Sequence, residues 1–223
     1  LESVVANLTS PGDRQLVLSS GNFGERWAGM ARAFGADLVH VQLAWGESPE
    51  PDDLRAALAE AGDVRVVYLT HSETSTGVVA DVQSLAAAAK EAGALVAIDA
   101  VSSLGAVPLE PDAWGLDAVA SGSQKALMTP PGLGLAVVSD QAWASVREPA
   151  GSGPVQTAFA DALHCASALA GDLRLGVRRL HLFAGAAEAA LAGAEGFDRR
   201  PQRRGIEVRP QRVGEIQLGV SEL

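Results

Sequence analysis

Apolar and polar positions divide the first part of the chain into short apolar runs and longer stretches with helical spacing. An apolar run bounded by turn residues is typical of a buried strand, and apolar positions three or four residues apart are typical of a helix with one buried face. We expect strands over residues 15–18, 38–41, 64–69, 95–98, 118–120 and 134–138, and helices over residues 1–8, 23–34, 51–61 and 82–92.

Strands that alternate with helices in this way are joined by crossover connections, which place helices on both faces of a parallel sheet. The sequence therefore predicts the α/β class, as a three-layer sandwich around a mostly parallel sheet. The pattern changes beyond residue 146. There we expect a turn over residues 148–154, helices over 155–169 and 173–194, an arginine-rich surface over 198–212 and a short strand over 214–220.

Composition narrows the class of protein. Hydrophobic residues make up 48% of the 223 residues, enough for the core of one large or two small domains, and the net charge of −10 argues against a nucleic-acid partner. Cys165 is the single cysteine, which excludes an internal disulfide and a cysteine-based metal cluster, and its alanine-rich surroundings favour a small buried side chain. No apolar stretch is long enough to span a membrane and no leader pattern opens the chain, so we expect a cytoplasmic protein.

The stretch from Gly115 to Val138 carries the most unusual lysine. Lys125 follows an apolar run and a polar SGSQ turn, and a Pro-Pro-Gly turn comes soon after it. We expect these small and apolar flanks to desolvate the ammonium in part, which would lower its pKa and leave an amine able to attack a carbonyl. A solvated surface charge is the alternative interpretation.

Three further loops with unusual residues follow predicted strands. They cover residues 19–24, with one aromatic side chain, residues 70–77, dense in hydroxyls, and residues 99–103, which begin with a carboxylate. Ligands of open parallel sheets bind at the carboxyl ends of the strands. We therefore expect the aromatic ring, the hydroxyls, Asp99 and Lys125 to meet at one edge of the sheet.

The segments SGSQKALMTPPG (121–132), THSETSTG (70–77) and LVAIDAVSSLG (95–105) resemble, in order and spacing, those of the class V aminotransferases. These are pyridoxal-phosphate enzymes of fold type I, and the alanine:glyoxylate (serine:pyruvate) branch is the most similar. By this resemblance Lys125 is the Schiff-base lysine that also moves the substrate's proton, and Asp99 is the partner of the pyridine nitrogen. The other cofactor-binding residues that the resemblance implies are Val101 beneath the ring, Phe23 stacked on it, Thr74 near its phenolic oxygen and Gln124 at the phosphate.

Each of these residues also has a purely structural interpretation. Asp99 could cap a following helix, Phe23 could pack in the core, and Thr74 could belong to a turn cluster. His71 is expected to be a structural hydrogen-bonding residue rather than an acid or base.

The resemblance covers about residues 2–138 and fades at both ends. Family members have a phosphate-gripping turn before the first residue of this chain, and Gln217 stands where they have an arginine that binds the substrate carboxylate. The resemblance implies a homodimer, with a truncated cofactor-binding large domain over residues 1–170 and a shortened C-terminal domain over residues 171–223.

Three functions remain open from the sequence. The first is an aminotransferase that moves an amino group between a small amino acid, such as alanine or serine, and a 2-oxo acid, glyoxylate or pyruvate. The second is a lyase of the same fold, of the cysteine desulfurase type, which would need a cysteine on a mobile loop. The third is a truncated, non-catalytic remnant of the fold.

Overall fold

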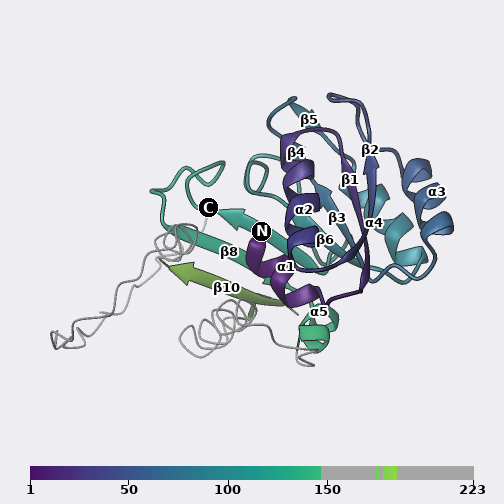
Figure 1. Cartoon of the computed structure of the whole chain (residues 1–223). Coiled ribbons are helices and arrows are strands. Elements are labelled where there is room, and N and C mark those ends of the chain that lie inside the picture. Colours follow the sequence, from purple (N-terminus) through teal and green to yellow (C-terminus); the bar gives the residue numbers. More distant parts are fainter. Residues whose placement is uncertain (147–173, 176–177, 185–223) are drawn as a thin grey trace, which may run out of the picture. The chain divides into compact units, whose positions relative to one another are not determined.

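A computed structural model of the chain describes residues 1–146, 174–175 and 178–184 (Figure 1). The chain divides into two compact units, Leu1–Glu188 and Ala189–Leu223, and every described residue belongs to the first. The helices are α1 (Glu2–Leu8), α2 (Asn22–Ala33), α3 (Pro51–Ala61), α4 (Val82–Glu91) and α5 (Asp140–Val146). The strands are β1 (Arg14–Ser19), β2 (Asp37–Gln42), β3 (Val66–Thr70), β4 (Ser72–Glu73), β5 (Val78–Val79), β6 (Leu95–Asp99), β7 (Ala118–Gly122), β8 (Leu133–Val138), β9 (Arg174–Leu175) and β10 (Arg178–Ala184).

One sheet organises this unit, with strands in the order β2-β1-β3-β6-β7-β8-β10-β9. The pairs from β2 to β7 are parallel, whereas β8 runs antiparallel to both β7 and β10. A separate antiparallel hairpin is formed by β4 and β5. The prediction of a mostly parallel sheet is confirmed.

Helices cover both faces of the sheet, and the strand residues alternate between the two layers. Leu16 and Leu18 of β1 pack in the cluster that contains α3 and α4. Val17 of the same strand packs with α1, α2 and α5 on the opposite face, where the rings of Trp27 and Tyr68 lie 4.9 Å apart. Because successive strand residues point to opposite faces, one buried strand serves two cores. The predicted three-layer α/β fold is confirmed.

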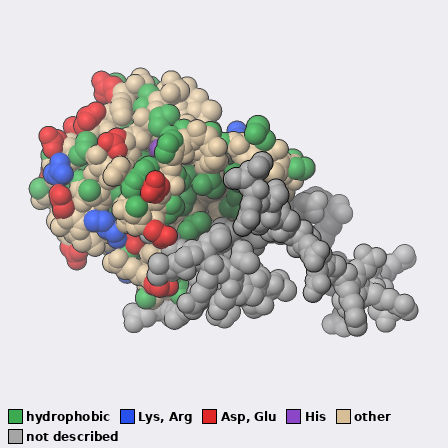
Figure 2. Space-filling view, turned by 180° about the vertical axis from the view of Figure 1, so that it is seen from behind, with side chains coloured by type: hydrophobic (Ala, Val, Ile, Leu, Met, Phe, Trp, Pro, Cys, Tyr) green, Lys and Arg blue, Asp and Glu red, His purple; other side chains and the backbone are tan. Residues whose placement is uncertain are grey.

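The polar surface agrees with the composition. Figure 2 shows a face on which acidic side chains outnumber basic ones, in keeping with the net charge of −10. None of the described helices has the length and apolar character needed to cross a membrane.

The helix predicted over residues 173–194 is wrong where the structure describes it. Residues 174–175 and 178–184 are the strands β9 and β10, and β10 pairs with β8 from Arg179 opposite Val138 to Ala184 opposite Leu133. The free edge of β8 offers hydrogen bonds that outweigh the weak helical preference of this segment. The predicted helix over 155–169, the arginine-rich surface over 198–212 and the strand over 214–220 lie outside the described residues, as do Cys165 and Gln217.

Candidate active site

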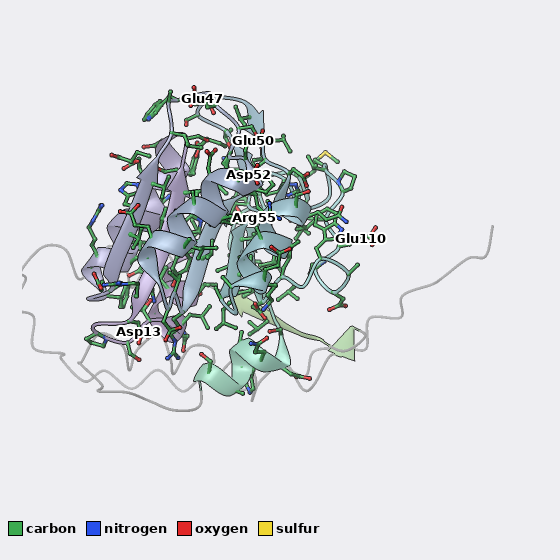
Figure 3. All side chains as sticks on the ribbon, turned by 90° about the vertical axis from the view of Figure 1, so that its right-hand side faces the viewer. Asp13, Glu47, Glu50, Asp52, Arg55 and Glu110 are labelled. Carbon is green, nitrogen blue, oxygen red and sulfur yellow. The ribbon has the colours of Figure 1, made fainter. Side chains whose placement is uncertain are left out.

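The carboxyl ends of β1, β3, β6 and β7 lie at one edge of the sheet. The register places Thr70 of β3 beside Asp99 of β6, and Asp99 beside Ala120 of β7. Two residues labelled in Figure 3 mark the two edges of the sheet. Glu47 follows β2 and marks the carboxyl edge, and Asp13 precedes β1 and marks the amino edge. The four predicted loops therefore do follow strands that end at the same edge.

Asp99 is a buried carboxylate at the end of β6, with 5% of its surface exposed. Its Oδ1 accepts a hydrogen bond of 2.9 Å from the backbone N–H of Val101, in a turn rather than at the start of an α-helix. Burial raises the pKa of Asp99, although the Val101 N–H opposes this, and the charge of Glu73 raises it further. The helix-capping interpretation of Asp99 is therefore wrong, and the carboxylate keeps a second oxygen for another partner.

Buried polar atoms without a partner gather in the same loops. They are Oγ1 of Thr70, Nδ1 of His71 and Oγ of Ser103, of which His71 is 2% and Ser103 0% exposed. Burial lowers the pKa of His71, which favours the neutral imidazole. The structural hydrogen bond expected of His71 is not formed at Nδ1 by any of the described residues. Unpaired buried polar groups are rare and costly, so this donor and acceptor set fits a polar ligand such as pyridoxal phosphate.

Phe23 stands in the first turn of α2 and is half-exposed. It belongs to neither hydrophobic cluster of the described residues, so core packing does not account for it. Its backbone N–H donates to both carboxylate oxygens of Glu73, at 3.3 and 3.0 Å. The backbone of Phe23 is therefore held beside the loop that carries Thr74.

Glu73 is the residue that sequence reasoning missed. It is 2% exposed and also accepts from the backbone N–H of Gly24 at 3.0 Å, so it caps a helix that begins about fifty residues earlier. A Cβ added at Gly21 would stand 2.5 Å from Glu73 Cγ, which explains the glycine before α2. A lone glutamate within a hydroxyl-rich loop gives no sign of this remote contact, so the sequence offered no signal for it.

Thr74 is exposed and belongs to a polar link between two loops. Its Oγ1 donates to Oγ of Ser102 at 2.9 Å. Because Ser102 lies in the turn that follows Asp99, the Thr74 hydroxyl is tied to the same loop as Val101, which is half-buried. The structure thus joins the loops of Thr74 and Asp99 directly.

Lys125 is exposed in the turn that follows β7, so the expected partial burial of its ammonium is wrong. The loop closes instead around buried Ser123, whose Oγ donates to the carbonyl of Pro130 at 2.7 Å and whose carbonyl accepts from Thr129 Oγ1 at 2.8 Å. Small and apolar flanks here serve this closure rather than the burial of the lysine. Gln124 is also exposed, and its Oε1 lies 3.0 Å from where a Cβ of Gly122 would be.

The sequence contains two lysines, and they differ in their surroundings. Lys90 donates to the buried carboxylate of Asp117 and lies 3.4 Å from Oε1 of Gln141, at the amino edge of the sheet. No side chain among the described residues forms a hydrogen bond or ion pair with the ammonium of Lys125. Of the two lysines, Lys125 is therefore the one without a charged partner among the described residues.

A wide hollow lies at the opposite edge of the sheet from these loops. It has a volume of about 850 Å³ and is lined by residues that include Arg14, Asp37, Arg65 and Gln141. Arg14 and Arg65 form ion pairs with Asp37 and Asp13, at 2.7 and 3.3 Å. Both arginines of this hollow are thus paired with aspartates, whereas the loops at the carboxyl edge hold the predicted site residues.

The match to a known family agrees with this site. The profile of the family Aminotransferase class-V matches residues 1–170. The chain belongs to the class-V aminotransferases. The Soluble hydrogenase 42 kDa subunit of Anabaena cylindrica is 48% identical over 146 residues, which are 64% of this chain and 38% of that protein. The L-aspartate–glyoxylate aminotransferase of Paracoccus denitrificans is 39% identical over 149 residues, or 65% and 38% of the two chains.

A solved structure gives the same result for the fold of this class-V aminotransferase chain. The alanine–glyoxylate aminotransferase from Nostoc sp. aligns with a TM-score of 0.71 and 32% identity, over 80% of this chain and 46% of that one. The chain thus spans less than half the length of the relatives that it matches. Enzymes of this family use pyridoxal phosphate, so the cofactor is implied for this chain by membership.

Proposed function

We propose that the chain carries the cofactor-binding part of a pyridoxal-phosphate-dependent aminotransferase. The reaction moves an amino group between a small amino acid, alanine or serine, and a 2-oxo acid, glyoxylate or pyruvate. The observation that carries the proposal is the pair formed by an unpaired lysine, Lys125 after β7, and a buried carboxylate, Asp99 at the end of the neighbouring strand β6. Relatives named as glyoxylate aminotransferases support the substrate class.

Each residue has a part in this proposal. When bound, the cofactor supplies a ring that accepts electrons from the substrate's α carbon. Asp99 holds a proton on the ring nitrogen, because a buried carboxylate favours a cationic partner. Lys125 holds the cofactor covalently and carries the proton of the substrate's α carbon, for which its exposed position leaves the amine free to move. Phe23 and Val101 lie against the two faces of the ring.

Hydroxyl and amide groups complete the cofactor contacts. The Thr74 hydroxyl would lie near the phenolic oxygen, because its bond to Ser102 keeps it beside the Asp99 loop. Gln124 donates to the phosphate from the turn that also bears Lys125.

We further propose a cytoplasmic homodimer with a cofactor-binding domain over residues 1–170 and a shortened C-terminal domain over residues 171–223. Support for the dimer comes from large apolar side chains exposed on loops at the carboxyl edge. Trp45, after β2, is 65% exposed, and Met128, after β7, is 90% exposed. Tryptophan and methionine are among the residues that are enriched in interfaces between protein chains.

The two alternatives are distinguishable. A lyase of the desulfurase type would need Cys165 as a nucleophile, and this residue lies outside the described part of the chain. A non-catalytic remnant agrees with the short span relative to the relatives, but it would not require the unpaired lysine and buried carboxylate at one edge.

The deciding experiment adds pyridoxal phosphate to the purified chain, records the visible absorbance and reduces the product with borohydride. Peptide mapping then has only two lysines to compare. We expect a stable label on Lys125 and none on Lys90, and amino transfer from alanine or serine to glyoxylate. No label, or label on Lys90, contradicts the proposal, and release of sulfide from cysteine favours the lyase instead.

A further inference from the structure

A buried carboxylate joins the two loops that would face each other across the cofactor ring. Glu73 of β4 accepts from the backbone N–H groups of Phe23 and Gly24, the first turn of α2. It also accepts from the backbone N–H and the hydroxyl of Ser75. The carboxylate therefore accepts hydrogen bonds from both segments, and Glu73 is only 2% exposed.

A second hydrogen bond links the same two segments of the chain. The backbone N–H of Asn22 donates to Oγ of Ser75 at 2.9 Å, so the same hydroxyl bridges Glu73 and the start of α2. On the other side, Thr74 is bonded to Ser102 in the loop after Asp99. The chain of contacts thus runs from Phe23 through Glu73 and Ser75 to Thr74, and on to the Asp99 loop.

The position of the carboxylate at a helix N-terminus adds an electrostatic contribution. The first N–H groups of a helix have no partner within the helix and carry partial positive charge, which favours an anion there. Glu73 supplies that anion from the chain itself. The N-terminus of α2 is consequently occupied, and a cofactor phosphate has to be bound elsewhere.

We propose that Glu73 is a positioning residue, which fixes the backbone of the first turn of α2, and with it the Cα of Phe23, relative to Thr74 and Asp99 by capping α2 from a distant loop. Helix capping usually comes from a residue adjacent to the helix, as Asp81 caps α4 through the N–H of Ser84 at 3.1 Å. A remote cap adds stability and also links two loops of the site. The part of the inference that concerns the cofactor ring rests on the proposed function, whereas the capping itself does not.

The test compares Glu73→Gln with the wild-type chain, in two measurements on the full chain. Glutamine has the size of glutamate but loses the charge and one acceptor, so hydrogen exchange at the amides of Phe23 and Gly24 should become roughly tenfold faster. The dissociation constant for pyridoxal phosphate should rise roughly tenfold, with a smaller visible circular dichroism signal, because Phe23 no longer holds one orientation. The borohydride-stable label should remain on Lys125.

Two more variants make the result specific. Asp81→Asn is the matched loss of charge at the local cap of α4 and should leave both the Phe23 amide and the cofactor affinity at wild-type values. Gly21→Ala places a Cβ against Glu73 Cγ and should reproduce the faster exchange without changing the carboxylate chemically. It also provides the answer if Glu73→Gln does not fold.

The inference is overturned if Phe23 and Gly24 exchange at wild-type rates in the Glu73 and Gly21 variants. It is equally overturned if Asp81→Asn weakens cofactor binding as much as Glu73→Gln does, since the effect would then be general destabilisation. A wild-type chain that binds no pyridoxal phosphate would contradict the proposed function, and the exchange rates alone would still decide whether Glu73 holds Phe23 in place.

Discussion

The two edges of the sheet satisfy their polar groups differently. At the amino edge, Arg14 pairs with Asp37, and Lys90 pairs with buried Asp117, which also accepts from Ser139 Oγ at 2.8 Å and from the backbone N–H of Val96. At the carboxyl ends of β3, β6 and β7, side-chain atoms of Thr70, His71 and Ser103 are buried without a hydrogen-bond partner among the described residues. Nε of Arg65 at the amino edge is also buried without a hydrogen bond, but it forms an ion pair with Asp13.

In the proposed function, this difference corresponds to a stabilising amino edge and a ligand-binding carboxyl edge. Leaving a buried polar atom unpaired costs about 1–3 kcal/mol, so a fold that does so at several neighbouring positions is less stable than it could be. Such departures concentrate where a ligand completes the structure. The two lysines make the contrast testable, because each edge holds one.

The largest expected effect is the loss of chemistry in Lys125→Ala. We expect the borohydride-stable label to disappear and any amino transfer to fall by at least about 10³-fold, since the variant lacks both the covalent link and the proton carrier. The free energy of unfolding should change by less than about 0.5 kcal/mol, because the side chain is exposed. Urea unfolding and the labelling assay check both statements. A clear loss of stability would mean that Lys125 is structural.

Lys90→Met should give the reverse result. Methionine keeps most of the apolar stem but leaves the Asp117 carboxylate, whose side chain is 4% exposed, without its cation. We expect the free energy of unfolding to fall by about 3 kcal/mol, with labelling of Lys125 unchanged under conditions where the chain is folded. Unfolding by urea at neutral pH is the measurement. If labelling is lost from the folded variant, the two edges are not independent.

Asp99→Asn changes the carboxyl edge by a single charge. The amide can still accept from the N–H of Val101 but no longer favours a protonated ring nitrogen, so pyridoxal phosphate should bind roughly tenfold to a hundredfold more weakly. Stability should not fall, because the variant buries no charge. Binding titration and urea unfolding test this, and an unchanged affinity would remove Asp99 from the proposed site.

The sequence predicts the amino-terminal part of this fold well because its signals are local. The predicted helix over residues 51–61 agrees with α3, where Pro51 opens the helix and Glu50 and Asp53 form a capping box. The strands end at turns on the amino edge and at polar loops on the carboxyl edge, and both can be recognised from their amino-acid composition. The helix predicted around β10 failed because its partner, β8, lies about forty residues earlier.

The candidate site was predictable only in part. The resemblance indicated Asp99 and Lys125, and the structure places both at the carboxyl edge. The prediction that Lys125 is partly buried was wrong. The small residues around it allow the loop to close around Ser123, and they do not determine the direction of the lysine side chain. Glu73 could not be found from the sequence, because its partners at Phe23 and Gly24 are contacts of the folded chain alone.

The smallest expected effect is the pH dependence that His71 gives to stability. Burial lowers its pKa in the folded chain, so the unfolded chain takes up a proton first when the pH falls below about 6.5. The contribution of His71 is therefore complete above that pH and is lost as the pH falls through the lower folded-state value, by about 1.4 kcal/mol per pKa unit of difference. His40, whose pKa is lowered by burial and by Arg32, acts with the same sign.

We expect His71→Gln to reduce the loss of unfolding free energy between pH 7 and pH 5 without abolishing it, because His40 remains. Urea unfolding at the two pH values measures this loss. Arg14→Gln is the matched change at the amino edge, where the exposed pair with Asp37 should contribute less than about 1 kcal/mol. An unchanged pH dependence in His71→Gln would mean that the buried imidazole has a partner in solution. In that case the buried polar groups at the carboxyl edge would have more hydrogen-bond partners than the comparison of the two edges assumes.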